Sequence, residues 1–267
     1  MKVVLLAGGY GTRFGKLTDF LPKPMIPIGP FPILCHIMRY YAHFGHNEFI
    51  VCSGYKSELI KEYFLNLATY THDFTIGFAA GGAPRIDVHD AGDGFSPRVT
   101  IAYTGQDTMT GARIKRAARY LGDDERFMVT YGDGVTDLDV GELVAFHKDH
   151  GKAATLTSVF PPPRFGALHF EGDRVTHFAE KDPQQEAMVN GGYYVFERSV
   201  LDTLEKDRKC VLEKAPMHRL SEEGELMAFR HPGYWQCMDT TRDLESLQDA
   251  WASGAAPWKV WQGGYDD

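Results

Sequence analysis

The residues that first suggest chemistry are glycines and cations that follow an apolar segment at the start of the chain. Residues 3–7 are apolar, which predicts a buried strand, and the glycine-rich segment 8–13 comes directly after them. Glycines let backbone N–H groups approach phosphate oxygens, and the cations Arg13 and Lys23 can neutralise phosphate charge. A dinucleotide fingerprint would need a glycine where Phe14 stands, and a Walker A loop would need Gly-Lys-Ser/Thr. The segment therefore predicts another kind of triphosphate site, or else a plain glycine turn with solvated cations.

Two aspartates are placed where a metal ion could bind. Asp133 lies between two glycines directly after the predicted strand 127–131, so its carboxylate has room for a hydrated ion. Asp239 lies just ahead of a predicted helix at residues 241–253. A tight turn would explain Asp133 alone, and an N-cap would explain Asp239 unless a neighbouring threonine caps the helix. Both aspartates are therefore candidate ligands of a divalent metal.

Three cations gather at the start of a predicted helix to which residues 108–111 lead. Arg113, Lys115 and Arg116 lie in its first turn and a half, although positive charge near a helix N-terminus opposes the helix dipole. An anionic ligand would account for these cations, and so would a solvated basic face. Both interpretations of Arg113 stay open from the sequence.

The second half of the chain holds candidate groups for a phosphorylated sugar. Lys181 follows a predicted strand at residues 175–179, and Asn190 precedes Gly191 at a glycine corner. A lysine suits a phosphate monoester, and an asparagine suits hydrogen bonds to hydroxyl groups. Taken singly, each would be interpreted as a surface lysine or a turn asparagine.

Composition and charge limit the classes of function. The chain has 267 residues, 43% of them hydrophobic, which is enough for a full core. Its formal net charge of −8 argues against a nucleic-acid or anionic-membrane partner, since such partners need a broad basic face. No apolar run approaches the ~20 residues that cross a bilayer, and the N-terminus leads straight into a strand, so we expect a cytoplasmic protein. The spacing of the four cysteines suggests buried thiols and no zinc or disulfide framework: Cys35, Cys52, Cys210 and Cys237.

Alternating helices and strands must position these groups. Apolar residues recur at helical spacing over residues 33–44, a strand-like segment follows at 48–53, and a second helical pattern covers residues 59–67. This order predicts an α/β fold with parallel strands joined by crossovers. Ligands collect at the carboxyl ends of such strands, where segment 8–13 would lie.

Two segments interrupt the alternation. Residues 80–97 are rich in Gly, Asp and Pro, which predicts an exposed excursion, and the prolines at 161–163 predict a stiff break. We expect one domain, residues 1–262. Its nucleotide-binding half would span 1–160, and a smaller β-rich sugar-phosphate half with a C-terminal helix would span 161–262.

Several longer motifs, taken together, resemble one enzyme family. They occur from residue 1 to about residue 261 and include G-G-x-G-T-R, P-K-P-M, T-M-T-G-x-R, Y-G-D-G-V, N-G-G-Y and G-Y-W-Q-x-M-D-T. The first is typical of sugar-1-phosphate nucleotidylyltransferases in general, whereas T-M-T-G-x-R and G-Y-W-Q-x-M-D-T are more specific. The chain resembles the glucose-1-phosphate cytidylyltransferases within that family.

This resemblance implies a Rossmann-like, mostly parallel sheet flanked by helices, and the conversion of CTP and α-D-glucose 1-phosphate to CDP-glucose and pyrophosphate. It also implies Mg²⁺ as cofactor, in-line attack on the α-phosphate, and a homo-oligomer, a hexamer. The implied catalytic residues are Arg13 and Lys23, the implied metal ligands are Asp133 and Asp239, and the implied sugar-phosphate residues are Lys181, Asn190 and Gly191. The implied nucleotide-binding residues are Leu6, Ala7, Gly8, Gly9, Tyr10, Gly11, Thr12, Arg13, Lys23, Thr108, Arg113 and Gly132.

Two positions depart from the family's pattern. Phe31 stands where the family usually has a lysine, and Asp182 stands beside Lys181 in place of a proline. Both departures concern the sugar acceptor, and neither touches the expected triphosphate site. Transfer to another sugar 1-phosphate or phosphorylated metabolite, and a non-catalytic regulatory protein that binds sugar nucleotides, stay open as alternatives.

Overall fold

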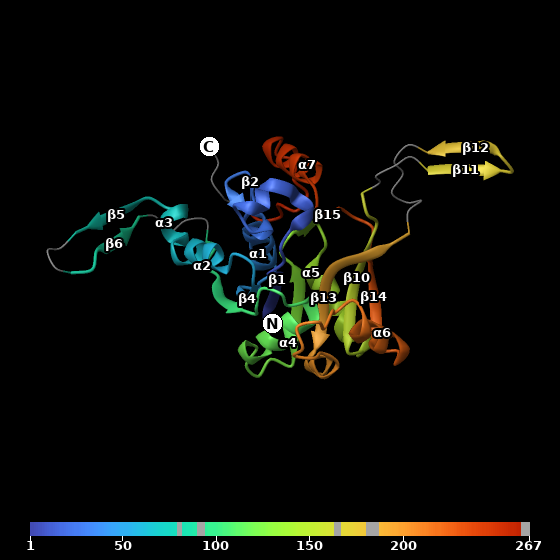
Figure 1. Cartoon of the computed structure of the whole chain (residues 1–267), viewed down its shortest axis with the longest axis horizontal. Coiled ribbons are helices and arrows are strands. Elements are labelled where there is room, and N and C mark those ends of the chain that lie inside the picture. Colours follow the sequence, from blue (N-terminus) through green and yellow to red (C-terminus); the bar gives the residue numbers. More distant parts are fainter. Residues whose placement is uncertain (79–81, 90–93, 163–166, 180–186, 263–267) are drawn as a thin grey trace.

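A seven-stranded sheet forms the centre of the structure, a computed structural model that describes residues 1–78, 82–89, 94–162, 167–179 and 187–262 (Figure 1). In spatial order the strands are β14 (Leu226–His231), β10 (Ala154–Val159), β13 (Val189–Glu197), β8 (Arg126–Tyr131), β1 (Val3–Ala7), β4 (Glu48–Ser53) and β7 (Arg98–Tyr103). Neighbouring strands are parallel except where β13 pairs with β8 and β10. The predicted mostly parallel α/β sheet is confirmed.

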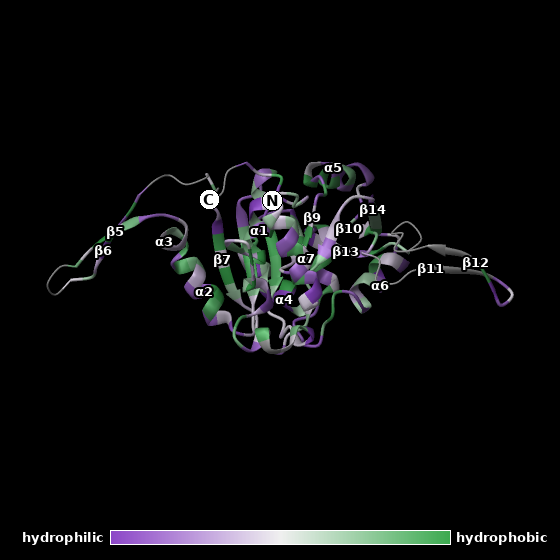
Figure 2. Cartoon of the chain, turned by 90° about the horizontal axis from the view of Figure 1, so that it is seen from above, coloured by the Kyte–Doolittle hydropathy of each residue, from purple (hydrophilic) through white to green (hydrophobic). Residues whose placement is uncertain are grey.

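Strand β1 shows why the sheet is buried on both faces. Side chains alternate along a strand, so Val3 and Leu5 pack into one hydrophobic cluster and Val4 and Leu6 into a second one. The first cluster includes side chains from α1 (Ile33–His43), α2 (Ser57–Leu65), α5 (Val140–His150) and α7 (Thr241–Ala252). The second includes side chains from α4 (Thr110–Ala117) and α6 (Ala215–Glu222). Burial from both sides requires an apolar residue at every position, and Figure 2 shows this hydrophobic centre of the fold.

The helices follow the predicted alternation with one correction. Helix α1 and strand β4 match the segments predicted at 33–44 and 48–53. The second helix, expected after Tyr55 with apolar residues recurring as far as Leu67, begins at Ser57. It ends at Leu65, because Asn66 leaves the helical conformation and a short helix α3 (Leu67–Thr71) follows. Apolar periodicity continues across this break, so the spacing of apolar residues could not locate it.

Short elements connect the sheet to its helices. Those among the described residues include the 3₁₀ segments η1 (Thr12–Asp19), η2 (Lys23–Met25), η3 (Ala118–Tyr120) and η5 (Arg198–Thr203). Two small ladders pair β2 (Pro27–Ile28) with β3 (Phe31–Pro32), and β9 (Gly134–Thr136) with β15 (Trp235–Cys237). The β9–β15 ladder joins segments about one hundred residues apart in the sequence, just beyond the end of β8.

Two β-hairpins extend away from the body on opposite sides (Figures 1 and 2). One pairs β5 (Phe74–Gly77) with β6 (Arg85–Val88), and the other pairs β11 (Ala167–Glu171) with β12 (Arg174–Ala179). The excursion expected at residues 80–97 is exposed along β6, but it contains regular structure that its composition did not indicate. Alternating apolar residues in β6, Ile86 and Val88, were the missed signal.

The cysteines, the helices and the C-terminal tail can be compared with what the sequence predicts. Cys35 and Cys52 are buried as expected, whereas Cys210 and Cys237 are only half-buried, and all four are free thiols. No helix in the described ranges has both the length and the apolar character needed to span a bilayer. The tail around Trp258 packs on the body with its indole fully buried.

His36 ties this tail to the body of the fold. Its imidazole is fully buried, with Nε2 2.8 Å from the carbonyl oxygen of Ile28, and Nδ1 accepts a hydrogen bond from Nε1 of Trp258 at 3.3 Å. Because Nδ1 is an acceptor, the ring is neutral and Nε2 carries the hydrogen. Burial lowers the pKa of His36 to about 4.

This burial predicts a pH-dependent stability. An unfolded histidine has a pKa of about 6.5, so the unfolded chain binds a proton at His36 between pH ~6.5 and ~4 while the folded chain does not. The stabilisation is complete above pH ~6.5 and is lost as the pH falls towards 4, by about 3 kcal/mol. Urea unfolding at a series of pH values should show this loss in the wild type and a smaller loss in His36→Gln. Identical pH dependences for the two proteins would contradict it.

Candidate active site

Strands β1 and β8 bring two distant parts of the chain to one edge of the sheet. They are parallel neighbours in which Leu6 pairs with Tyr131, and the N–H of Gly132 donates to the carbonyl of Leu6 at 3.0 Å. The segment after β1 and the aspartate after β8 therefore leave the sheet side by side. This is the carboxyl edge, where parallel sheets collect ligands.

A cavity of about 290 Å³ lies at this edge. Its lining contains Leu6, Ala7, Gly8, Gly9, Gly11, Thr12, Arg13, Lys23, Pro24, Thr108, Met109, Thr110, Arg113, Tyr131, Asp133 and Asp239. We call it the glycine cup. Of the residues predicted for the nucleotide and metal, only Tyr10 and Gly132 do not line the cup, and each is adjacent in sequence to a residue that does.

Lys23 holds the two predicted metal ligands together. Its Nζ is 2.7 Å from Oδ2 of Asp133 and 2.6 Å from Oδ1 of Asp239, and an Nη atom of Arg13 is 2.8 Å from Oδ2 of Asp239. Lys23 is almost fully buried, whereas the guanidinium of Arg13 is largely exposed. Two carboxylates that are more than one hundred residues apart thus share a single ammonium.

Burial and the carboxylates act in opposite directions on this ammonium. Burial alone would lower the pKa of Lys23, but the charge of Asp133 and hydrogen bonds to both aspartates outweigh it and raise the pKa overall. Burial likewise acts to raise the pKa of Asp239, and Lys23 and Arg13 outweigh it and lower that pKa. Lys23 and Asp239 are therefore both charged at neutral pH.

Short ladders and a helix cap fix the position of Asp239. The N–H of Met238 donates to the carbonyl of Asp133 at 2.8 Å, which extends the β9–β15 ladder up to the two aspartates. Thr240 caps α7 and forms a capping box with Asp243. The alternative interpretation of Asp239 as the N-cap is therefore wrong. Because its carboxylate does not cap α7, it can face the cup.

The cup requires glycine at positions 8 and 11, and the glycine at position 9 has open space beside it. A Cβ on Gly8 would lie 2.1 Å from the guanidinium of Arg113, and Gly11 has a φ of 65° in the left-handed region. A Cβ on Gly9 would meet no atom of the chain within 4 Å. Gly9 thus has open space beside its backbone, where a phosphate group could approach.

Arg113 is neither solvated nor paired with a carboxylate. Its guanidinium is almost fully buried and donates to the carbonyls of Gly8, Ser53 and Gly105 and to Oγ1 of Thr104. These acceptors follow or end strands β1, β4 and β7, so one side chain connects the ends of three strands. Burial lowers the pKa of Arg113, and neutral acceptors leave its positive charge beside the cup uncompensated. The solvated-face interpretation is therefore wrong for Arg113.

Glu213 is a polar residue near the cup that the sequence did not reveal. Its carboxylate accepts a hydrogen bond from the hydroxyl of Tyr131 and another from Oγ1 of Thr110 at 2.8 Å. Both partners line the cup, so Glu213 fixes two of its walls. No glycine or motif letter marks Glu213 in the sequence, and only the packing of α4 against residues 210–213 brings it there.

The predicted sugar-phosphate residues lie beside the cup or outside the described residues. Asn190 donates to the hydroxyl of Tyr194 at 2.5 Å and accepts from the N–H of Gly192 at 3.0 Å, and the carbonyl of Gly191 accepts from Trp235 at 2.8 Å. Neither Asn190 nor Gly191 lines the cup. Lys181 and Asp182 fall outside the described residues.

Phe31, the other departure from the family pattern, is buried at the start of α1. Its ring is stacked by Arg39, whose guanidinium carbon is 4.4 Å from the ring centroid. It does not line the cup.

Comparisons with known proteins agree with this geometry. Residues 2–252 match the family model for nucleotidyl transferases. The chain is 49% identical over 263 residues to "Glucose-1-phosphate cytidylyltransferase" of Salmonella typhi, which covers 98% of this chain and 100% of that protein. It is 39% identical to "Probable glucose-1-phosphate cytidylyltransferase" of Bacillus subtilis, with 98% and 100% covered.

Solved structures share the fold at low sequence identity. A putative glucose-1-phosphate thymidylyltransferase from Bacillus anthracis superposes with a TM-score of 0.67 at 16% identity, covering 99% of this chain and 98% of that one. A UDP-glucose pyrophosphorylase superposes with a TM-score of 0.66 at 14% identity, covering 95% and 98%. From its match to the family model and its full-length relatives, the chain belongs to the nucleotidyl transferase family.

Proposed function

We propose that this protein transfers the cytidylyl group of CTP to α-D-glucose 1-phosphate and releases CDP-glucose and pyrophosphate. Two full-length relatives named for this activity support the choice of substrates. The single structural observation that carries the proposal is the convergence of Lys23, Asp133 and Asp239 in the glycine cup. A non-catalytic regulatory protein would not need to preserve this charged cluster.

The cup would bind the nucleotide through its backbone and its cations. The segment from Leu6 to Thr12, with Tyr10 at its rim, would surround the phosphates, and the open space beside Gly9 would admit them. Arg113 supplies a buried positive charge that no carboxylate among the described residues neutralises. Thr108 and Gly132 would complete the nucleotide site.

Asp133 and Asp239 fit a magnesium ion. Mg²⁺ takes oxygen ligands and is commonly held by one or two carboxylates together with substrate phosphates and water. In the described part of the chain, no three side chains among His, Cys, Asp and Glu gather as a metal site. The nucleotide phosphates and water would supply the other ligands. Bound there, Mg²⁺ would act as a Lewis acid on phosphate oxygens.

The reaction needs positioning and charge neutralisation more than a base. A phosphate oxygen of the sugar phosphate is already ionised at neutral pH and attacks the α-phosphorus in line. A new P–O bond forms, the bond to the β-phosphate oxygen breaks, and its electron pair leaves with pyrophosphate. Arg13 and Lys23 lie in the cup to neutralise the charge that develops on the departing group.

The acceptor would bind on the side of the cup next to β13. Tyr131 lines the cup, and a Cβ on Gly192 would lie 2.5 Å from its ring, so the segment that carries Asn190 and Gly191 adjoins the cup. These residues, with Lys181, would hold the sugar phosphate. The proposed division into halves 1–160 and 161–262 follows this separation of substrates.

An oligomer is the expected state of the protein. In the β5–β6 hairpin, Phe74 and Ile76 pair with Val88 and Ile86 and share one face of the ribbon, and all four are exposed within the single chain. An apolar face of this kind is typical of a contact between protein subunits. It supports a homo-oligomer, and the number of subunits, a hexamer, comes from the family resemblance alone.

A substrate panel tests the function. With Mg²⁺, pyrophosphate release should be fastest with CTP and glucose 1-phosphate, and other nucleotides or sugar 1-phosphates should lower kcat/KM by about tenfold or more. The panel should include ATP, GTP, UTP and dTTP, with galactose 1-phosphate and mannose 1-phosphate as acceptors. A higher kcat/KM for another pair would reassign the substrates, and nucleotide binding without any release would revive the regulatory alternative.

Asp133→Asn should abolish turnover and leave the fold intact. The substitution keeps the shape of the side chain but removes the charge that would hold the ion, so we expect a loss of at least ~10²-fold in kcat. The measurements are pyrophosphate release and the thermal unfolding midpoint. Asp123→Asn, at an exposed turn, is the matched control and should keep full activity. A near-normal rate for Asp133→Asn in magnesium would end the metal assignment.

Lys23→Ala should lower kcat by ~10² or more, because we propose that its ammonium neutralises charge on the departing pyrophosphate. The exposed Lys61→Ala serves as its control and should be indistinguishable from the wild type. Steady-state kinetics with both substrates varied separate an effect on kcat from one on KM. An unchanged kcat would restrict Lys23 to a structural role as the counterion of the two aspartates.

A further inference from the structure

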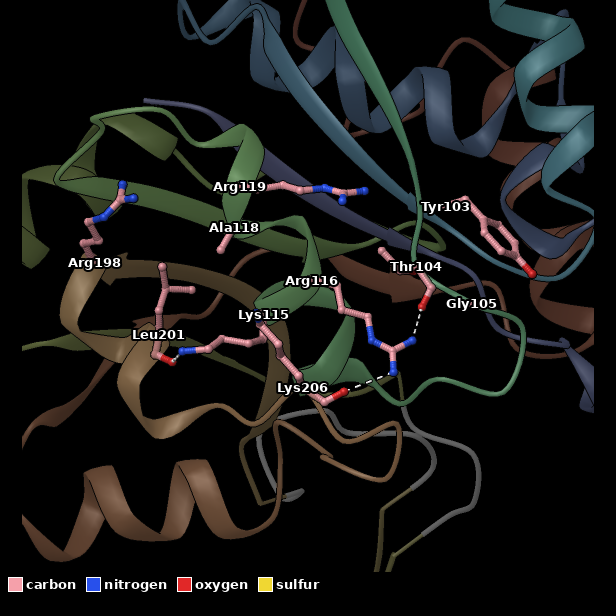
Figure 3. Close-up of a pocket in the computed structure, with 10 residues that line it drawn as sticks. All are labelled: Tyr103, Thr104, Gly105, Lys115, Arg116, Ala118, Arg119, Arg198, Leu201 and Lys206. Atoms are coloured by element: carbon pink, nitrogen blue, oxygen red, sulfur yellow. Dashed lines mark hydrogen bonds between the residues drawn. The ribbon is translucent and has the colours of Figure 1, made fainter.

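A second cavity, separate from the glycine cup, lies beside α4 and is lined by cations (Figure 3). Its volume is about 670 Å³, and its lining includes Lys115, Arg116, Arg119, Arg198 and Lys206. We call it the basic cavity. These cations come from α4, η3, η5 and the segment after η5, so four segments of the chain each contribute positive charge to one concave surface.

The described residues do not balance the positive charge in the basic cavity. No acidic residue lines it, and within the ranges that the structure describes none of the five cations forms an ion pair. The protein as a whole carries a formal net charge of −8. Like charges gathered in one concavity repel one another, and a bound anion would offset that repulsion.

Neutral carbonyls hold several of these cations in place. Nζ of Lys115 donates to the carbonyl of Leu201 at 2.6 Å, and an Nη atom of Arg116 donates to the carbonyl of Lys206 at 3.0 Å (Figure 3). Arg198 donates to the carbonyls of Gly122 and Asp124. Carbonyl acceptors orient a cationic group without cancelling its charge, so these groups are positioned in advance for a ligand.

We propose that the basic cavity is a second anion site, for a molecule that carries two or more linked phosphates. Its volume falls in the range of about 300–1,000 Å³ that is usual for small-molecule sites. A multiply charged polyphosphate matches the number of cations better than a single phosphate does. Free pyrophosphate and a nucleoside di- or triphosphate share this chemistry.

The glycine cup and the basic cavity share a wall. A ligand bound in one of these cavities would therefore affect binding in the other. Arg116 donates to the carbonyl of Thr104 at 2.7 Å and to Oγ1 of Thr108 at 2.8 Å, and Thr108 lines the glycine cup. Gly105 lines the basic cavity, and its carbonyl accepts from Arg113 of the cup at 2.9 Å. An anion that attracts Arg116 would therefore act on Thr108, and this coupling rests on the proposed function of the cup.

Inorganic pyrophosphate is the probe, titrated into the full-length protein by calorimetry without divalent metal. The wild type should bind two equivalents per chain. The double variant Arg119→Gln/Lys206→Gln should retain one equivalent, with the affinity for the second weakened by tenfold or more. Its control, Arg98→Gln/Lys148→Gln, removes one arginine and one lysine that are exposed away from the cavity, and it should bind two. The thermal unfolding midpoint of each variant shows whether a loss of pyrophosphate binding comes from a damaged fold. The single variant Arg119→Gln provides a milder change for the same comparison.

The outcomes separate this proposal from the proposed function. In Lys23→Ala, pyrophosphate should bind more weakly in the glycine cup, and its binding in the basic cavity should be unchanged. Adding Arg119→Gln/Lys206→Gln to Lys23→Ala should then remove binding in the basic cavity. A single wild-type equivalent that persists in Arg119→Gln/Lys206→Gln, or an unchanged second equivalent in that variant, would overturn the proposal. A single wild-type equivalent that is lost in Arg119→Gln/Lys206→Gln would support the basic cavity and count against pyrophosphate binding in the cup. In Lys23→Ala, displacement of the bound pyrophosphate by CTP identifies a nucleotide as the ligand, and its retention identifies free pyrophosphate.

The coupling is tested on nucleotide affinity at a fixed pyrophosphate concentration. Competition within the cup is common to both proteins, so any difference between them reports the basic cavity. The apparent Kd for CTP of the wild type should differ from that of Arg119→Gln/Lys206→Gln by about fivefold or more. Equal values would overturn the coupling through Arg116.

Discussion

The ammonium of Lys23, held between the carboxylates of Asp133 and Asp239, is the interaction on which the site depends. Two carboxylates close together repel each other, and a cation that lies between them offsets this repulsion so that both can stay ionised. Lys23 supplies that cation within the chain itself, and it does so almost fully buried, where its attraction to the carboxylates is screened little by water. The same arrangement suits a divalent ion, because the charge and the oxygen ligands are already gathered.

The sheet and the helix caps make this convergence possible. Parallel pairing of β1 with β8 sends the glycine segment and Asp133 out of the same edge, and the β9–β15 ladder returns the chain so that Asp239 joins them. Arg113 then ties the ends of β1, β4 and β7 together through carbonyl acceptors. The cup is thus built by elements that are rigid for reasons of backbone pairing, and its charged side chains are added at their ends.

Much of this could be predicted from local sequence patterns. A continuous apolar run predicted β1, and apolar residues at helical spacing predicted α1. Glycines that follow a strand indicated a phosphate-binding edge of the sheet. Features set by distant contacts could not be predicted. The role of Arg113 depends on carbonyls at the ends of three strands. Glu213 reaches the cup only because its segment packs against α4. The helix break at Asn66 leaves the spacing of apolar residues unchanged. The roles assigned to Asn190, Gly191 and Lys181 and the boundary near residue 160 stay predictions.

The central claim is that two aspartates distant in sequence act as one unit, and a double-mutant cycle on Asp133→Asn and Asp239→Asn tests it most directly. If both carboxylates hold the same ion, removing the second one after the first should cost little more, so that kcat/KM of the double variant lies close to that of the slower single variant. If the losses in the two single variants multiply in the double variant, the carboxylates act independently and the shared site does not exist.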